Sequence, residues 1–283
     1  MTRVATRLNA DLHSHSTVSD GTLAPGDLVR RAAEQGVELF ALTDHDEIGG
    51  IAEAAACAEA IGLAFVPGVE ISVTWAGRTV HVVGLGIDPQ DSALRAGLAT
   101  VRSGRTGRAR QMGEQLARVG IDGAFEGALR HVGNPELVSR THFARFLVEL
   151  GVCRDTREVF GRYLVEGRPG YVPHRWAQLS QALRWIVEAG GVAVIAHPGR
   201  YRFTDIELGA LAAEFRDLGG EAIEVVTSNH GAEQAQRFAA MALEFGFAAS
   251  RGSDFHGPGE SNAELGRVRA LPQRLTPVWE RFL

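Results

Sequence analysis

Short apolar segments alternate with helical segments along most of this 283-residue chain, and this alternation constrains the fold more than any other feature. The segment Val192-Ala-Val-Ile-Ala196 has the length of a strand and no polar face. Strands that are apolar on both faces are typical of parallel sheets covered by helices. The expected strands are residues 8–15, 37–43, 64–70, 79–85, 192–196, 222–226 and 247–252. The expected helices between them are residues 25–35, 51–61, 177–189, 206–218 and 232–245.

Glycine and proline mark several of these boundaries. Pro25 suits the first turn of its helix, and Gly36 and Gly62 suit the positions just after two helices. Seven strands in mostly strand–helix order predict an α/β fold, with a seven-stranded TIM-like (β/α)7 barrel as the main expectation. A doubly wound open sheet is the alternative.

Residues 100–175 break this alternation because they contain helical segments and no convincing strand. Helices are expected at 93–119, 141–150 and 156–165. The segment holds 13 Arg against 8 acidic residues, whereas the rest of the chain holds 16 Arg against 26 acidic residues, and the chain has no Lys. We therefore predict a helical insertion at 100–175 in a barrel formed by 1–99 and 176–283. Its densest cluster, Arg102, Arg105, Arg108 and Arg110, is either a solvated helix face or a cationic wall that faces an anion or a nucleic acid.

Histidine and carboxylate residues follow nearly every expected strand. They are His13, His15, Asp20, His45, Glu70, His81, His197, Asp254 and His256, and His142 comes from the insertion. The carboxyl ends of barrel strands open onto one mouth, so we expect these side chains to meet there. So many imidazoles and carboxylates in one mouth would repel one another and be poorly solvated without cations.

The residue types indicate which cations would bind. Histidine and carboxylate ligands without cysteine favour Zn, Mn or Fe, and the two cysteines, Cys57 and Cys153, exclude a disulfide scaffold and a cysteine-type zinc site. The candidates exceed the needs of one tetrahedral ion, so we expect two or three divalent ions, with Mn²⁺ first and Zn²⁺ or Fe as alternatives. Closely spaced ions are typical of phosphoryl-group hydrolysis.

The order of the motifs resembles the PHP family, the polymerase and histidinol phosphatase family. The motifs are His13-Ser-His15, Ser19-Asp-Gly21, Thr43-Asp-His45, Gly68-Val-Glu70, His81, Arg140-Thr-His142, Ala196-His-Pro198 and Gly252-Ser-Asp-Phe-His256. The resemblance implies a distorted barrel and a trinuclear metal site. One ion would be bound by His13, His15 and Asp254 with Glu70 shared, a second by Glu70, His81 and His142, and a third by Asp20, His45 and His256. His197 lies outside this set.

Within that family, the chain resembles a subgroup with a helical insertion after the fourth strand and a segment like Ser228-Asn-His230. The resemblance implies a hydrolase that removes the 3′-phosphate of nucleoside 3′,5′-bisphosphates such as pAp and trims short 5′-phosphorylated RNA from 5′ to 3′. Two alternatives remain: a small-molecule phosphatase such as histidinol phosphatase, and a non-catalytic module that binds metal or nucleic acid. The basic insertion favours the first function, since a small phosphomonoester needs no extended cationic wall.

Further roles follow from residue chemistry. His197 is the candidate general acid, because an imidazole titrates in the right range. Asp20 is a second candidate catalytic residue. Arg200, Asn229 and His230 are candidate substrate-binding residues. Trp176 and Tyr201 are either stacking platforms for a base or packing residues, and Asp44 and Asp46 are expected to orient His45. His131 and His174 lie in no motif.

The sequence shows neither a membrane span nor a secretory signal. No apolar run reaches the roughly 18 residues of a membrane span, and the N-terminal residues lack a secretory apolar region. We therefore expect a cytoplasmic protein whose partner is its nucleotide substrate, with no membrane and no obligate protein partner.

Overall fold

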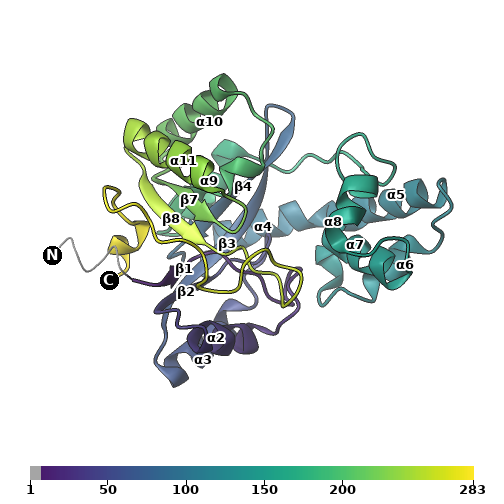
Figure 1. Ribbon diagram of the computed structural model, residues 1–283, viewed down its shortest axis with the longest axis horizontal. Coiled ribbons are helices and arrows are strands. Elements are labelled where there is room, and N and C mark those ends of the chain that lie inside the picture. Colours follow the sequence, from purple (N-terminus) through teal and green to yellow (C-terminus); the bar gives the residue numbers. More distant parts are fainter. Residues whose placement is uncertain (1–7) are drawn as a thin grey trace.

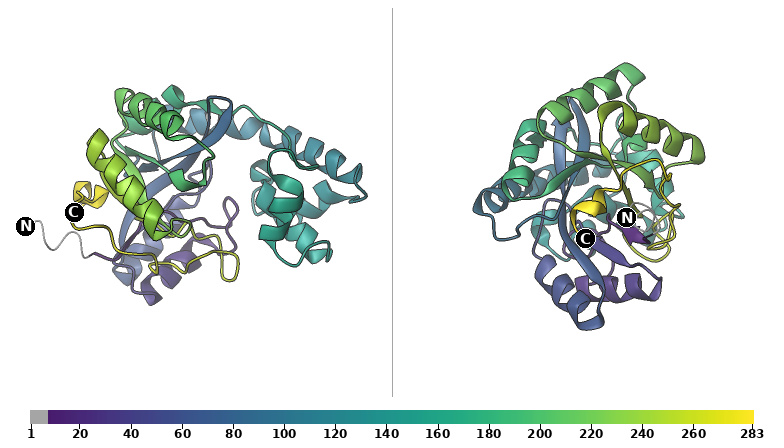
Figure 2. Two further views of the ribbon diagram at one scale, coloured as in Figure 1. Left: turned by 45° about the horizontal axis from the view of Figure 1, so that its top comes forward. Right: turned by 90° about the vertical axis from the view of Figure 1, so that its left-hand side faces the viewer.

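The computed structural model describes residues 8–283, which form a barrel and a separate helical cap (Figure 1). The cap, defined here as residues 105–172, has its own hydrophobic core around Leu116, Phe143, Leu147 and Leu164. Helix α4, Ser92–Ser103, bridges the two bodies, and the carboxyl-terminal residues lie on the side of the barrel away from the cap (Figures 1 and 2).

Each expected barrel strand is present, but β1 spans only two of the eight residues expected for it. The strands are β1 Ala10–Asp11, β2 Leu39–Leu42, β3 Ala64–Trp75, β4 Arg78–Leu85, β6 Val192–Ile195, β7 Ala222–Thr227 and β8 Ala248–Gly252, and a short β5, Ala177–Gln178, pairs with β3. Their order in the sheet is β1-β2-β3-β4-β6-β7-β8. Strand β3 continues five residues past its expected end at Glu70, because it forms a long hairpin with β4.

The last strand closes onto the first. The amide of Leu12 donates to the carbonyl of Arg251 at 3.1 Å, and the amide of His15 donates to the carbonyl of Phe255 at 2.8 Å. A side chain at Gly252 would place its Cβ 2.4 Å from the Cβ of His13, so only glycine permits this approach. The seven-stranded barrel expected from the sequence is therefore confirmed.

Strand β4 departs from an ideal parallel barrel. It runs antiparallel to both neighbours, β3 and β6, while the other adjacent pairs in the order are parallel. The amino-terminal half of β4 therefore lies at the mouth where the other strands end, and this orientation places His81 there.

Helices cover the outside of the barrel, with α10 and α11 visible along one side in Figure 1. They are α2 Pro25–Glu34, α3 Ile51–Ile61, α4 Ser92–Ser103, α9 Leu179–Glu188, α10 Asp205–Asp217 and α11 Ala232–Phe245, with short 3₁₀ turns at Pro198–Arg200 and Val278–Arg281. Leu94 and Leu98 of α4 are buried in the same core as Trp185 and Ile186 of α9. The chain therefore leaves the barrel after α4.

The cap is entirely helical. It contains α5 Arg105–Ala117, α6 Ala124–Leu129, α7 Arg140–Glu149 and α8 Thr156–Val159, with a 3₁₀ turn at Pro135–Leu137 and a π-helical turn at Phe160–Leu164. The continuous helix expected at 93–119 is wrong: it breaks at Gly104 into α4 and α5. Within the described part of the chain, no helix is both long and apolar enough to cross a membrane.

Candidate metal centre and substrate cavities

Glu70 is the centre of the predicted site, because five imidazoles surround its carboxylate. His81 Nδ1 and His197 Nε2 each lie 2.8 Å from Oε1. The other three face Oε2: His45 Nδ1 at 2.9 Å, His13 Nε2 at 3.2 Å and His15 Nε2 at 3.3 Å. Glu70 is fully buried and each of its carboxylate oxygens faces at least two imidazoles, so it could serve as a ligand to more than one cation.

The structure brings the sequence-predicted residues into three overlapping groups that could each hold a metal ion. They are His15, Asp20, His45 and His256; His13, His15, Glu70 and Asp254; and His45, Glu70 and His81. Within each group the candidate ligand atoms lie within 4.8 Å of one another. His15, His45 and Glu70 each belong to two groups, so bound ions would be close neighbours.

The backbone holds three residues of the mouth in positive-φ conformations. Asp46, His197 and Asp254 have φ of 51°, 27° and 54°, and of the non-glycine residues described only Ala76, in the β3–β4 turn, shares this property. Such conformations cost free energy and persist where the surrounding structure enforces them. We infer that the fold holds these ligand-bearing turns rigidly.

The charge pattern favours cations at this position. The carboxylates lose hydration on burial, yet neighbouring imidazoles, and for Asp254 the guanidinium of Arg200, hold the pKa values of Asp20, Glu70 and Asp254 well below their usual range. Burial disfavours the charged form of His15, but hydrogen bonds to Asp254 and Glu70 raise its pKa to about 10. Without metal, protons on imidazoles therefore supply the positive charge that these carboxylates require.

Unpaired lone pairs in the mouth give an independent test of the fit to metal. Within residues 8–283, several buried ligand-type atoms crowd one another without forming a hydrogen bond of normal geometry: His13 Nε2, His15 Nδ1, His45 Nδ1, Asp20 Oδ1 and Glu70 Oε2, among others. Buried polar atoms are rarely left in this state, and coordination of divalent ions would satisfy them. The residues present therefore fit a divalent metal centre.

Glu224 is a functional residue that the sequence analysis missed. Its Oε1 lies 2.8 Å from His13 Nδ1, and its Oε2 accepts a hydrogen bond from the backbone amide of His197. It thus fixes the ring of one candidate ligand and the turn that carries another. The sequence feature that could have identified Glu224 is its position as the one carboxylate inside the apolar strand segment 222–226.

His142 and His197 lie differently from the expectation. Neither His142 nor His197 belongs to any of the three groups. His142 Nδ1 accepts the amide hydrogen of Ser139 at 3.0 Å, and Ser139 in turn donates to Asp20 Oδ2 at 3.1 Å. His197, expected as the general acid, contacts Glu70, and burial together with Arg200 lowers its pKa to about 4. This geometry does not support an acid role for His197.

Asp44 and Asp46 hold the loops of the mouth rather than the ring of His45. Asp44 accepts hydrogen bonds from Ser16 and Ser19, and Asp46 accepts them from Ser72 and forms an ion pair with Arg105. The two carboxylates thereby tie the loop after β2 to the loop after β1 and to β3.

The predicted substrate-binding residues divide into two kinds. Arg200 pairs with Asp254. When the carboxamide oxygen of Asn229 is turned toward Arg200, it accepts a hydrogen bond from Arg200 Nε at 2.9 Å. His230 is buried, and its ring nitrogens contact the carbonyl of Val225 at 3.0 Å and the amide of Gly199 at 3.1 Å. His230 therefore holds the turn that presents Arg200, and its ring nitrogens are already engaged.

The two aromatic candidates also differ. The Tyr201 hydroxyl donates to the carbonyl of Ala196 at 2.8 Å and accepts from the amide of His81 at 2.8 Å, so it fixes the backbone. Trp176 lines the mouth, with the guanidinium groups of Arg105 and Arg108 4.7 and 5.3 Å from its ring centroid.

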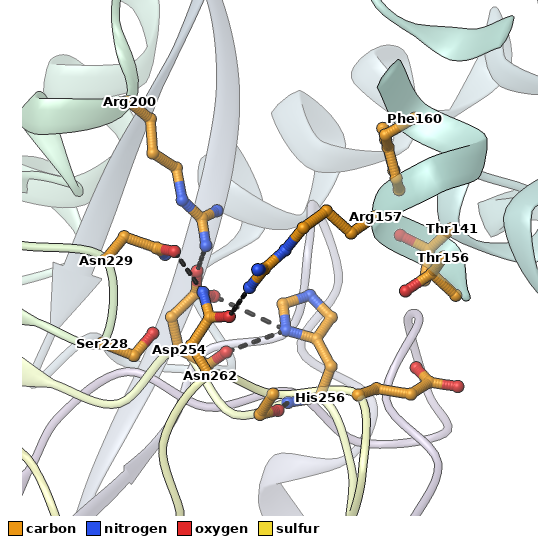
Figure 3. Close-up of a pocket in the computed structure, with 12 residues that line it drawn as sticks. Thr141, Thr156, Arg157, Phe160, Arg200, Ser228, Asn229, Asp254, His256 and Asn262 are labelled. Carbon is orange, nitrogen blue, oxygen red and sulfur yellow. Dashed lines mark hydrogen bonds and ion pairs between the residues drawn. The ribbon is translucent and has the colours of Figure 1, made fainter. Parts of the chain in front are cut away.

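Three adjoining cavities lie between the barrel and the cap, and Arg200 lines all of them. The first cavity, about 160 Å³, also contacts Asp20, His45, His81 and His256, so it lies over the predicted metal ligands. The second, about 360 Å³, is shown in Figure 3, where Arg157 and Phe160 of the cap face Asn229, Asp254 and Asn262 of the barrel. The third, about 410 Å³, is lined by arginines and aromatic residues.

The four clustered arginines do not form one wall. Arg102 lies 3.3 Å from Glu47, Arg105 pairs with Asp46, and Arg110 lies over the ring of Phe125. Of these four, only Arg108 borders the cavities without an acidic partner among the described residues.

Comparisons with known proteins agree with this geometry. The model of the PHP domain matches residues 11–151. The chain is 52% identical to the 3′,5′-nucleoside bisphosphate phosphatase of Chromobacterium violaceum over 97% of this chain and 96% of that protein. It is 41% identical to the 5′-3′ exoribonuclease of Haemophilus influenzae over 96% of this chain and 98% of that protein. Among solved structures, an amidohydrolase from Chromobacterium violaceum with bound sulfate and no metal superposes with a TM-score of 0.94 at 51% identity, covering 96% of this chain and 95% of the other.

Proposed function

The chain belongs to the PHP domain family, and we propose that it is a metal-dependent phosphoesterase that removes the 3′-phosphate of nucleoside 3′,5′-bisphosphates such as pAp. The convergence of five imidazoles on the buried carboxylate of Glu70 is the observation that supports this proposal most strongly. A histidinol-phosphatase-like activity is less favoured, since the relatives at 52% and 41% identity are named a nucleoside bisphosphate phosphatase and an exoribonuclease.

Two or three divalent ions would be held by the three overlapping groups of ligands. Histidine and carboxylate ligands suit Mn, Zn and Fe alike, and we propose Mn²⁺ as the first ion to test. We assign His197, rather than His142, to the ion beside Glu70 and His81, since His197 Nε2 lies 2.8 Å from Glu70 Oε1.

When bound, the ions supply positive charge that stabilises the phosphate oxygens and makes water a stronger nucleophile near neutral pH. The protein supplies position. Arg200, held by Asp254 and Asn229, points a guanidinium into the mouth where it can donate to a phosphate oxygen. Glu224 keeps His13 and the turn at His197 in place.

A second activity, 5′→3′ trimming of short RNA, uses the same site in this proposal. The ester at the 3′ position of the 5′-terminal nucleotide is cleaved in both reactions, and the leaving partner is either phosphate or the remaining RNA. The second cavity supports this, since Arg157, Asn229 and Asn262 line it with hydrogen-bonding groups that suit a diester backbone.

The experiment that tests the proposal is phosphate release with added Mn²⁺ from pAp, histidinol phosphate and a plain 5′-mononucleotide. We expect turnover of pAp to exceed that of the other two. Preference for histidinol phosphate, or no metal-dependent turnover of any of the three, would contradict the proposal.

A further inference from the structure

The second cavity opens directly onto the predicted metal ligands and is bounded on its other side by the cap. Arg200, Asp254 and His256 line it from the barrel, and Arg157 and Phe160 line it from the cap (Figure 3). Among the residues described, the third cavity is lined by no member of the three metal-binding groups. A chemical group joined to a phosphate at the metal centre can therefore extend into the second cavity without leaving the mouth.

One charge in the second cavity lacks a counter-charge. Asp254 and Glu260, the carboxylates that line it, each pair with an arginine. Arg157 forms no ion pair within residues 8–283. Its Nη2 donates to Asn262 Oδ1 at 2.7 Å, and the other N–H groups of its guanidinium make no hydrogen bond in the same range. A single unpaired guanidinium matches the single negative charge of a phosphodiester.

Phe160 provides an aromatic surface beside that charge. It is half-buried and lines both the first and the second cavity. No other aromatic ring packs against it in the described part of the chain, and only the guanidinium of Arg140 lies over it, 5.8 Å from the ring centroid. Aromatic side chains of this kind stack on nucleic-acid bases with little dependence on the base. Arg157 and Phe160 thus offer one contact for a phosphodiester and one for a base.

The proposed RNA reaction determines which nucleotide would reach this cavity. Water adds to the phosphorus, the bond to the 3′-oxygen of the first nucleotide breaks, and that oxygen takes a proton. The phosphate stays on the 5′-oxygen of the second nucleotide. The second nucleotide therefore begins at the metal centre, and its own 3′-phosphodiester lies one nucleotide further out. A nucleoside bisphosphate has neither group.

The third cavity is a poorer match for an internal nucleotide. Arg108, Arg140 and Arg202 line it together with one carboxylate, Glu166, and within residues 8–283 none of the three arginines forms an ion pair. That much unpaired positive charge exceeds the single negative charge that each internal nucleotide carries. The second cavity, with one unpaired arginine, suits the RNA beyond the cleaved bond better.

We propose that the second cavity binds the second nucleotide of an RNA substrate, with Phe160 against its base and Arg157 on the phosphodiester that follows it. This inference rests on the proposed function, which places the cleaved phosphate at the metal centre. The cavity volume of about 360 Å³ lies within the range of pockets that hold small ligands. Because pAp does not reach these two side chains, they determine how well RNA competes with mononucleotides.

The test compares pAp with the 5′-phosphorylated trinucleotide pApApA. The Mn²⁺-loaded wild-type enzyme, R157Q and F160L are assayed on both substrates. We expect the ratio of kcat/KM for pApApA to kcat/KM for pAp to fall roughly 10-fold in each variant, mainly through KM for the RNA.

Modified trinucleotides test each contact separately. An abasic second nucleotide removes the base assigned to Phe160, and a methylphosphonate between the second and third nucleotides removes the charge assigned to Arg157. The abasic substrate should be poorer for wild type but no poorer than pApApA for F160L. The methylphosphonate should be poorer for wild type but no poorer than pApApA for R157Q. Such non-additivity identifies direct contact, because a folding defect would leave both modifications with their wild-type effect.

Two further variants serve as controls. R154Q removes an exposed arginine of the same cap segment, which pairs with Asp155 and Glu158, and it should keep the wild-type substrate ratio. F160W keeps an aromatic surface, so it should retain both the preference for RNA and the sensitivity to the abasic nucleotide.

Equal losses on pAp and pApApA, or full sensitivity of R157Q to the methylphosphonate and of F160L to the abasic nucleotide, would overturn the inference and leave the proposed function intact. If wild-type enzyme hydrolyses pAp but not pApApA, the inference fails together with the RNA activity, and the phosphatase activity stands. If wild-type enzyme does not hydrolyse pAp, the proposed function itself fails. The failures are therefore distinguishable.

Discussion

The barrel mouth and the cap contribute to the site in different ways. The mouth is built from buried groups that hold one another: Glu70 meets five imidazoles, and Glu224 fixes His13. The cap has a separate core and reaches the mouth with a few polar side chains, among them Arg108, Ser139 and Arg140.

This difference assigns separate tasks to the two regions. A preorganised, buried set of ligands is suited to the chemical step, because its geometry must not change when charge develops. A cap with its own core is suited to substrate selection, because those of its cationic side chains that do not contact the ligand-bearing loops can change without disturbing the ligands. We expect variants of the mouth to affect all substrates alike and variants of the cap to discriminate between them.

The largest effect is expected from Glu70→Gln, which keeps the size of the side chain but removes the shared charge. Turnover of pAp, of adenosine 3′-monophosphate and of RNA should each fall by more than roughly 1,000-fold, because stabilisation by the ions is lost. Metal analysis of the purified variant should find less bound metal than in wild type. Full metal content with normal turnover would refute the central role of Glu70.

A pair of histidine variants compares the two regions next. His197→Ala should remove one bound ion and lower kcat by roughly 100-fold on all substrates. In His142→Gln, the glutamine occupies the third position of α7 and can replace the capping contact to Ser139. We expect this variant to keep its metal. Metal loss in His142→Gln but not in His197→Ala would restore the ligand set expected from the sequence.

The sequence predicted the residues of the mouth better than their grouping. Apolar runs that end in histidine or carboxylate locate strand ends, and this was enough to bring His13, His45 and Asp254 together. The direction of β4 could not be predicted, because a strand buried on both faces has the same apolar pattern in either direction. Glu224 was missed because side-chain alternation does not distinguish the barrel interior from the helix-covered face.

The cap was predicted as helical, but the orientation of its arginines was not fully anticipated. Arg105 and Arg108 lie three positions apart on α5 and share a face, whereas Arg110 lies two further on and points toward Phe125. Helical spacing alone could have separated Arg110. The ion pair of Arg105 with Asp46 needed the three-dimensional structure, because 59 positions separate the two residues.

The pH dependence of the metal-free protein should distinguish the mouth from the cap. His15 has its pKa raised from 6.5 to about 10, so its stabilising contribution is full below pH 6.5 and is lost as pH rises toward 10. His142 has its pKa lowered to about 4, mainly by burial. As pH falls from 6.5 toward 4, the unfolded chain takes up a proton on this histidine that the folded chain does not, so stability is lost.

Thermal melts of chelator-treated protein at several pH values test this. We expect the alkaline loss of stability, on the order of a few kcal/mol, to shrink in His15→Asn, and the acid loss to shrink in His142→Gln. Unchanged slopes in either variant would contradict the assigned histidine.

The smallest effect is expected where the cap is fastened to the barrel. Arg145 donates to Glu260 Oε1 at 2.9 Å and to the carbonyl of Asp20 at 2.6 Å. Arg145→Ala should lower RNA trimming by roughly 3- to 10-fold and pAp hydrolysis by less, because about 1–1.5 kcal/mol of positioning is lost. The matched control is Arg154→Ala, because Arg154 is an exposed cap arginine that pairs with Asp155 and Glu158 of the cap. Equal losses in both variants would remove this role from Arg145.

Titration of chelator-treated protein with Mn²⁺, with bound ions and pAp turnover measured on the same samples, tests the central claim most directly. We predict that turnover is negligible without metal and rises as two or three ions bind per chain, and that both signals are lost in Glu70→Gln. Full turnover in the metal-free protein, or a single bound ion at maximal turnover, would contradict the account.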